Sequence, residues 1–493
     1  MEHSDAAQIA ALLGSLGVVL VILGRGRVAP LAGFALLGAA VGMLGWSLAG
    51  DEVDLLLTRP AGIALLAAGA AAAVLIAVPL ARYPAVTPVA LLAVAPFRLP
   101  VELGDEEAFL LLPLYLVLAA SVLAFAVRVL REPAVASVPR LLGLPLAALA
   151  AFAAVSFLWT HDERQGAIAL AFFVFPFVAG FGIVARSQVA AWLPRALAFT
   201  LVGLGVLFAG IGLWQAQTKT IFFARDLEVA NAYTTFFRVT PLFKDPSLYG
   251  RYLVVPIAVL LVVIWLRRGR PLEWVVVAGL VAFLFAGLYF SYSQSSFVAL
   301  FVVTFAVAVV GAGRRLRIVL VACAVAAALA AAGFAASAVN GESAKEVTSG
   351  RSQLVEITLD AFRVNPVVGV GIGGQPLVSA EENGRRTSRR SASHTTPLTV
   401  LAELGVVGFA LYAWLLGAAS WALVLVTRHR RLLGFGLAAV LSVLFVHSLL
   451  YAGFFEDPLT WGVLAVAAAV LSSVPAPASA PEAASEPPPR LAH

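Results

Sequence analysis

The chain alternates between long runs of hydrophobic residues and short polar connections, a pattern that predicts membrane-spanning helices. A hydrocarbon core about 30 Å thick requires roughly 20 predominantly apolar residues of helix. Runs of this kind lie at residues 6–24, 28–50, 61–81, 84–97, 107–127, 141–158, 167–185, 189–213, 250–266, 273–291, 294–311, 318–338, 397–427, 432–453 and 457–474. The runs at 84–97 and 457–474 are short enough for tilted or re-entrant segments. We therefore expect an all-α, polytopic integral membrane protein with about 12–15 transmembrane helices.

Two long polar segments divide the hydrophobic runs into three groups of transmembrane helices. The groups are expected at residues 1–213, 250–339 and 397–474, and the polar segments between them at 214–249 and 340–396. Residues 475–493 are rich in Pro, Ala, Ser and Glu and are predicted to be disordered, because they lack the apolar side chains that form a core. Residues 1–24 lack a basic start and a small-residue cleavage site, so they predict a first span rather than a cleaved signal peptide.

The composition indicates the same class of protein. Of 493 residues, 61% are hydrophobic and 12% are charged, whereas soluble chains carry about 25% charged residues. Soluble enzyme folds, coiled coils and disordered scaffolds are therefore excluded as the main body. A single cysteine, Cys323, excludes a disulfide framework and a thiolate metal site, and six histidines leave little for a metal centre, so we expect no metal or other cofactor. The net charge of +6 does not suggest a nucleic-acid partner.

The arginines predict the orientation in the membrane, because short cytoplasmic connections carry an excess of positive charge. Alternate connections contain Arg25, Arg27, Arg82, Arg128, Arg131, Arg140, Arg186, Arg267, Arg268, Arg270, Arg314, Arg315, Arg317, Arg428, Arg430 and Arg431. The intervening short connections are mostly acidic, with Asp51, Glu52, Asp54, Asp105, Glu106, Glu107, Asp162, Glu163, Glu456 and Asp457. The amino terminus is therefore predicted outside, the carboxyl terminus in the cytoplasm, and both long polar segments on the outer face.

Basic residues in the two long segments depart from this rule. They are Lys219, Arg225, Arg238, Lys244 and Arg251 around the first segment, and Lys345, Arg351, Arg363, Arg385, Arg386, Arg389 and Arg390 in the second. Long loops are exempt from the orientation rule, so a solvated basic loop is one interpretation. The other is a basic vestibule for an anionic substrate, because arginine holds phosphate groups bidentately.

Residues 350–366 have the apolar spacing of an amphipathic helix at the membrane interface. Arg351 would stand at its start, either as an ordinary interfacial arginine or as a contact for a lipid-linked phosphate. The glycine-rich stretch that follows, residues 365–374, lacks the preceding strand and the Lys-Ser/Thr helix start of a nucleotide-binding loop. A flexible turn that returns the chain to the membrane is predicted there.

Two histidines and a serine cluster carry candidate chemistry. His394 opens a predicted span beside an arginine-rich loop, where it can serve as a general base near neutral pH or as a structural residue. His447 lies within a span and is expected to be a buried packing or hydrogen-bonding group. The serines of residues 291–296 raise the alternative of an intramembrane serine protease, but the G-x-S-G context of that class is missing.

Taken in order, these features resemble the O-antigen ligase and O-antigen polymerase superfamily of polytopic glycosyltransferases. The most specific match is His394, Thr395, nine residues and then G-V-V-G from Gly405 to Gly408. Arg351 with the amphipathic helix and residues 366–371 (PVVGVG) is similar to the outer-loop signature of the family, and residues 244–250 (KDPSLYG) to its Asp-Pro-Asn-x-x-Gly element. The resemblance covers residues 240–470 well, and in the first half it rests on residues 96–100 (PFRLP) and 111–115 (LLPLY).

The resemblance implies a metal-independent, inverting glycosyltransferase in the bacterial cytoplasmic membrane. Its donor is a glycan on a polyprenyl (undecaprenyl) diphosphate at the outer leaflet, and its acceptor is a sugar hydroxyl on a lipid core, another glycan chain or a protein. His394 would take the proton of the acceptor hydroxyl, and Arg351 would stabilise the leaving diphosphate. The resemblance further implies contacts of the donor diphosphate with Lys244 and the residue at Gln294, and supporting roles for Asp245, Ser293, Thr395, Glu403, Gly405 and Gly408.

Two positions depart from the family pattern. Gln294 stands where the family commonly has the arginine of Ser-x-Ser-Arg, and Thr395 stands where it usually has Asn, Ser or Gln. Arg251, at the mouth of its span, is expected to supply the missing charge to the donor diphosphate. The alternative function is a transporter or flippase of lipid-linked oligosaccharides, which typically shows internal repeats and mid-span charges; neither is obvious here. A ligase and a polymerase differ only in the acceptor, and both stay open.

Overall fold

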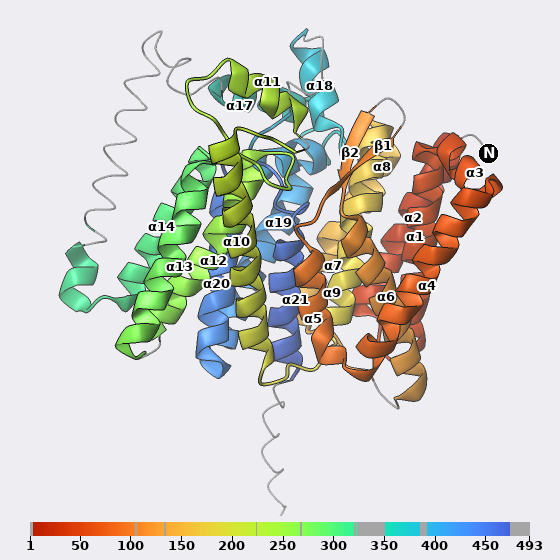
Figure 1. The fold of residues 1–493 in the computed structure, drawn as a ribbon. Coiled ribbons are helices and arrows are strands. Elements are labelled where there is room, and N and C mark those ends of the chain that lie inside the picture. The colour runs from red at the N-terminus through yellow and green to blue at the C-terminus, as the bar shows by residue number, and fades with distance from the viewer. Residues whose placement is uncertain are drawn as a thin grey trace, which may run out of the picture.

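The computed structural model describes residues 3–103, 106–132, 135–222, 224–266, 269–319, 322, 351–384 and 392–473, and shows a bundle of helices (Figure 1). Within these ranges, 12 helical segments are long and apolar enough to cross a membrane. They confirm the predicted class, an all-α polytopic membrane protein. Residues 320–321 and 323–338 of the predicted span at 318–338 lie outside the described residues, as do Arg267, Arg268, Cys323, Lys345, Arg385, Arg386, Arg389, Arg390 and the tail 475–493.

The first 184 residues supply six of the long apolar segments and most of the short elements. Its helices are α1 (His3–Leu23), α2 (Val28–Leu48), α3 (Gly50–Thr58), α4 (Pro60–Arg82), α5 (Thr87–Val94), α6 (Leu112–Arg131), α7 (Arg140–Val155), α8 (Glu163–Ala169) and α9 (Phe175–Val184). A π turn at Leu170–Val174 joins α8 to α9, so that Glu163–Val184 forms one span. Before α6, an antiparallel hairpin pairs β1 (Leu99–Leu103) with β2 (Glu106–Leu110).

The rest of the chain carries the long connections. Its helices are α10 (Leu193–Thr218), α11 (Arg225–Ala232), α12 (Pro246–Leu266), α13 (Pro271–Tyr289), α14 (Gln294–Gly311), α17 (Arg351–Val364), α18 (Gln375–Glu382), α19 (Thr396–His429), α20 (Arg431–Ser448) and α21 (Pro458–Ser472). The short hydrophobic runs of the sequence become the short apolar helices Pro84–Val94, which ends in α5, and α21. The predicted amphipathic helix is α17.

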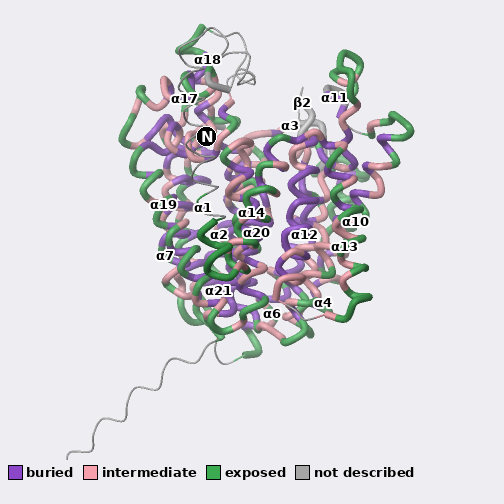
Figure 2. Tube along the Cα trace, turned by 90° about the vertical axis from the view of Figure 1, so that its left-hand side faces the viewer, coloured by how far each residue is buried: buried purple, intermediate pink, exposed green. Residues whose placement is uncertain are grey.

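Elements outside the bundle gather at one end of it. Figure 1 shows α11, α17, α18 and the hairpin at the top, which we call the upper end. The connections at the opposite end are short, and they include Arg270 between α12 and α13 and Arg430 between α19 and α20. Figure 2 shows buried residues in the interior of the bundle and exposed residues along its periphery. Phe199 and Phe301 are exposed on that periphery, as expected of a surface that faces lipid.

Helix α19 is interrupted near its start, at Gly405, whose φ of 64° and ψ of −166° are not helical. The glycine-rich segment 365–374 packs against this break. The amide of Val406 donates to the carbonyl of Pro366 at 2.9 Å, and the amide of Gly371 donates to the carbonyl of Glu403 at 2.9 Å. Backbone groups that the break releases are therefore paired with backbone groups of the glycine-rich segment.

The same glycine-rich segment also contacts the first half of the chain. Thr160 Oγ1 donates to the carbonyl of Ile372 at 2.8 Å, and the amide of Ile372 donates to Ser156 Oγ at 3.1 Å. Gly371 has a φ of 86°, and a Cβ atom there would overlap the backbone of Thr160. The glycines thus permit close packing of backbone on both sides, which corrects the prediction of a flexible turn.

Candidate active site

A polar cavity of about 400 Å³ lies at the upper end of the bundle. Its lining consists of Phe236, Arg238, Asp245, Ser247, Tyr292, Ser293, Gln294, Ser295, Leu354, His394, Leu450 and Tyr451. Four residues singled out from the sequence meet there: Asp245, Ser293, Gln294 and His394. They come from segments up to 149 positions apart, so the fold rather than the local sequence brings them together. We call this the polar cavity and take it as the candidate active site.

The starts of several helices converge on the polar cavity. Asp245 precedes α12, Ser293 precedes α14, His394 lies two residues before α19, and Leu354 belongs to the first turn of α17. Backbone N–H groups in the first turn of a helix lack intrahelical partners and carry a partial positive charge. Such helix starts favour anions, including phosphate groups. The Asp245 carboxylate in the lining accepts from the Ser247 amide at 2.6 Å and so occupies the start of α12. The starts of α14, α17 and α19 are left to favour a negatively charged ligand.

Arg238 brings a positive side chain into the polar cavity. Its backbone is held on both sides by Asn231, whose Nδ2 donates to the Arg238 carbonyl at 2.9 Å and whose Oδ1 accepts from the Arg238 amide at 3.0 Å. Its Nε donates to the carbonyl of Ser291 at 3.2 Å, which fixes the guanidinium beside the turn that carries Gln294. From the sequence, Arg238 is only one of several basic residues in a long polar segment. Its place in the cavity could not be predicted, because Ser291, which fixes its side chain, lies 53 residues away.

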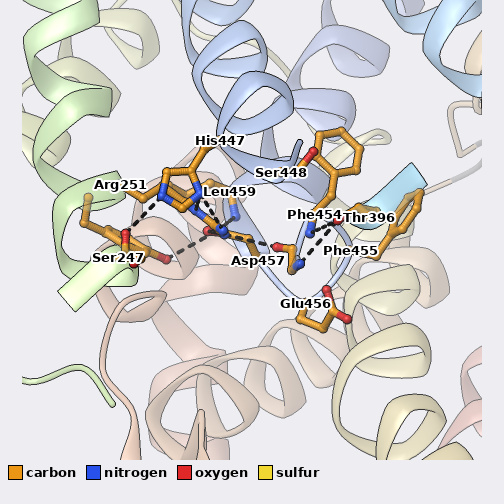
Figure 3. A network of polar contacts seen from close by, with 12 residues as sticks. Ser247, Arg251, Thr396, His447, Ser448, Phe454, Phe455, Glu456, Asp457 and Leu459 are labelled. Carbon is orange, nitrogen blue, oxygen red and sulfur yellow. Dashed lines mark hydrogen bonds and ion pairs between the residues drawn. The ribbon is translucent and has the colours of Figure 1, made fainter. Parts of the chain in front are cut away.

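Arg251 lies in a buried network next to the polar cavity rather than in its lining (Figure 3). Its side chain is 1% exposed, and Nη1 pairs with Asp457 Oδ2 at 2.8 Å and donates to the Gly453 carbonyl at 3.0 Å. The carboxylate of Asp457 also accepts from the Leu459 amide at 2.9 Å and so caps α21. The expected direct contact of Arg251 with the donor diphosphate is corrected accordingly, because its charge is already paired inside the protein.

His447 connects this network to the serines of the cavity. Its side chain is fully buried, as the sequence led us to expect. Its Nδ1 lies 3.2 Å from Arg251 Nε and 3.1 Å from Arg251 Nη2. Its Nε2 lies 3.1 Å from Ser295 Oγ and 3.1 Å from the carbonyl of Ser247. A chain of polar contacts therefore runs from α21 through α12 and α20 to the start of α14.

The other predicted site residues lie around the cavity. Lys244 is exposed, and its Nζ stands 5.7 Å from the ring centroid of Phe109 on the hairpin, outside the cavity lining. Thr395 follows His394 directly, and its amide donates to Ser393 Oγ at 3.2 Å. Arg351 is the first residue of α17, but its side chain lies outside the described residues; Leu354, one turn further, lines the cavity.

A second cavity of about 110 Å³ is lined in part by the first turns of α19. Its lining includes Glu403, Glu456 and Trp461, whereas Glu403 is not among the residues that line the polar cavity. Glu456 lines the same cavity with part of its surface exposed, and desolvation by the surrounding protein raises the pKa of its carboxyl group. Gly408 belongs to α19 and follows the break at Gly405; a Cβ atom at this position would overlap the side chain of Leu404.

The fold and the polar cavity define a polytopic membrane protein with an anion-favouring site at one end of its helical bundle. Residues 279–413 match the family model described as O-Antigen ligase. The matched range runs from α13 to the middle of α19. It includes Arg351, His394 and residues 290–293 between α13 and α14, which we call the serine turn. The match covers 135 of the 493 residues and supports membership of the O-antigen ligase and polymerase superfamily and a glycosyltransferase activity of the O-antigen ligase type, in a bacterial inner membrane. No curated protein matches the chain.

Proposed function

We propose that the protein transfers a glycan from a polyprenyl diphosphate carrier to a sugar hydroxyl of a glycan or lipid-core acceptor. The polar cavity carries this proposal. It combines the starts of α14, α17 and α19 with Arg238, which favour the diphosphate of the donor, and with His394, which can serve as a base.

In the proposed reaction, the acceptor oxygen forms a bond to the anomeric carbon of the donor sugar. The bond from this carbon to the diphosphate oxygen breaks, and its electron pair leaves with the diphosphate. His394 accepts the proton of the attacking hydroxyl, a contribution that is typically worth about 10²–10⁴-fold. One displacement inverts the configuration at the anomeric carbon.

The growing charge on the diphosphate needs fixed cations and hydrogen-bond donors. Arg238 faces the cavity and is held at the serine turn by Ser291. Arg351 stays a predicted contact for the diphosphate, on the ground that α17 begins beside the cavity. Together they would stabilise the leaving group from two different segments of the chain.

We further propose that the upper end faces the outside of the cytoplasmic membrane, with the amino terminus outside and the carboxyl terminus in the cytoplasm. The short connections at the opposite end include Arg270 and Arg430, and short arginine-rich connections stay in the cytoplasm. This orientation brings the polar cavity to the leaflet from which a polyprenyl diphosphate glycan would approach.

The test uses the purified protein in lipid nanodiscs with an undecaprenyl diphosphate-linked glycan and a glycan acceptor, and measures the release of undecaprenyl diphosphate. His394→Ala is expected to lower the rate about 100-fold or more, whereas His429→Ala, at the other end of the same helix, stays within about twofold of the wild type. An unchanged rate in His394→Ala would contradict the role of His394 as the base.

The same assay separates transfer from transport. A transporter or flippase of lipid-linked oligosaccharides moves the glycan while it is still attached to its carrier. In proteoliposomes, such a protein would change the sidedness of the labelled glycan without releasing undecaprenyl diphosphate. That result would refute the proposed function.

A further inference from the structure

In the buried network beside the polar cavity, Arg251 determines which groups donate hydrogen bonds and which accept them (Figure 3). A guanidinium group donates hydrogen bonds and never accepts them. Two of its nitrogens, Nε and Nη2, lie 3.2 and 3.1 Å from Nδ1 of His447, so Nδ1 is the acceptor. An imidazole whose Nδ1 accepts is neutral and carries its proton on Nε2.

The proton on Nε2 in turn decides the role of Ser295. Nε2 lies 3.1 Å from the Ser247 carbonyl and 3.1 Å from Ser295 Oγ. Both oxygens face a donor, so Ser295 Oγ accepts from His447. A hydroxyl group that accepts at this position keeps its own hydrogen for another partner. The structure offers Ser293 Oγ at 3.1 Å as that partner, and both serines line the polar cavity.

The hydroxyl group of Ser293 likewise accepts a hydrogen bond, in this case from the start of α14. Its Oγ accepts from the Ser296 amide at 3.3 Å and thereby caps the helix. Ser293 Oγ also lies 2.8 Å from Ser296 Oγ, whose hydroxyl donates to the Ser247 carbonyl at 3.4 Å. Ser293 and Ser295 therefore each accept from a protein donor, and each has a hydrogen that can turn from a neighbouring serine oxygen toward the cavity. A phosphate oxygen, which only accepts, is the ligand that fits two such hydroxyl groups.

We propose that Ser293 and Ser295 bind the diphosphate of the donor through their hydroxyl hydrogens, and that Arg251 and His447 are positioning residues that hold Ser295 in this role. The inference rests on the proposed function, because that function supplies the diphosphate. Two neutral donors then flank Gln294, the position where the superfamily commonly has an arginine. The Ser247 carbonyl, 3.1 Å from Nε2, supports the same tautomer as Arg251 does.

The first test measures the Kd for undecaprenyl diphosphate and kcat/KM for the lipid-linked donor. Ser295→Ala is expected to weaken binding and lower kcat/KM about tenfold, because a hydrogen bond to a charged group is lost, and to leave the KM for the acceptor unchanged. The matched control is Ser448→Ala. Ser448 is buried next to His447, and its hydroxyl donates to the Phe445 carbonyl at 2.7 Å, away from the cavity lining. The control should stay within about twofold of the wild type.

The second test is a double-mutant cycle between His447 and Ser295. His447→Leu is expected to weaken binding of undecaprenyl diphosphate about tenfold, and His447→Gln, which keeps an N–H donor near the place of Nε2, is expected to recover most of it. In the Ser295→Ala background, His447→Leu should weaken binding no further, because His447 acts on the diphosphate only through its hydrogen bond to Ser295. Melting temperatures of all variants, measured in parallel, separate folding from binding.

Three outcomes would overturn the inference: an unchanged Kd in Ser295→Ala, losses that multiply in the double variant, or a wild-type protein that does not bind undecaprenyl diphosphate. Failure of the proposed function looks different. In that case, the wild-type protein binds undecaprenyl diphosphate in a way that depends on Ser295 and yet releases none from the glycan-linked donor.

Discussion

Asp457→Asn is expected to destabilise the protein by about 3–5 kcal/mol, because it leaves the charged Arg251 buried without its counter-ion. The two side chains are each 1% exposed and their charged atoms are 2.8 Å apart. At that distance and an effective dielectric constant of about 20, the attraction is about 6 kcal/mol. The asparagine amide oxygen keeps part of the hydrogen bonding, so the net loss is smaller than the full attraction.

Asp457→Asn removes the negative charge but keeps the second role of this residue, which is to cap α21. Asp457 caps α21 through the Leu459 amide, and asparagine caps helices about as well as aspartate. A matched control is Asp162→Asn. Asp162 caps α8 by accepting from the Gln165 amide at 3.0 Å and has no ion pair among the described residues. Its substitution is expected to change stability by less than about 1 kcal/mol.

Thermal unfolding in detergent, followed by tryptophan fluorescence, measures the effect. A loss of this size is expected to lower Tm by roughly 5–10 °C, since longer chains show smaller shifts per kcal/mol. The double variant Arg251→Met with Asp457→Asn should recover part of the loss, because no buried charge is left unpaired. A Tm within 2 °C of the control variant, or additive losses in the double variant, would refute the description of Arg251 and Asp457 as a buried pair.

Three further outcomes test other parts of the structure. Arg238→Gln is expected to raise the KM for the lipid-linked donor about tenfold. Arg363 is exposed on α17 and lies outside the cavity lining, so Arg363→Gln should leave this KM unchanged. Equal effects of the two substitutions would contradict the place of Arg238 in the site. Gly405→Ala is expected to cost about 1–3 kcal/mol, because φ is 64° and a Cβ would overlap the glycine-rich segment; Gly417→Ala, which meets open space on the same helix, should not lower Tm. Desolvation by the surrounding protein raises the pKa of Glu456 above its ordinary 4.5, although the residue is partly exposed, so its contribution to stability is present at low pH and is lost as the pH rises. Glu456→Gln should therefore match the wild-type Tm near pH 4.5 and exceed it increasingly toward pH 8; a constant difference would argue against a titrating group.

The membrane-spanning helices could be predicted because each depends on its own residues. A run of about 20 apolar residues must form a helix in lipid, whatever its neighbours are. The break in α19 could not be predicted in this way, since a glycine inside an apolar run is common. Its non-helical conformation depends on the segment 365–374, whose backbone packs into the break.

The candidate site could be predicted only in its individual residues. His394, Ser293, Gln294 and Asp245 were recognised from local patterns, but their meeting in one cavity depends on how helices pack. The role of Arg251 was predicted from its place near a helix start, which does not tell whether the guanidinium faces a ligand or the interior. Its partner Asp457 lies 206 positions away, so only the fold reveals that its charge is neutralised.

The burial of Arg251 changes what this residue can contribute to an anion site. Arg251 and Asp457 together carry no net charge, so they add little attraction at the distance of a ligand in the polar cavity. What remains is the direction of the hydrogen bonds that Arg251 sets through His447. Positive charge at the cavity must come from Arg238 and, as predicted, Arg351, together with the helix starts, and the Asp245 carboxylate in the lining offsets part of it. Charge and hydrogen-bond direction are thus supplied by different residues, so variants of Arg238 should change the salt dependence of donor binding and variants of His447 should not.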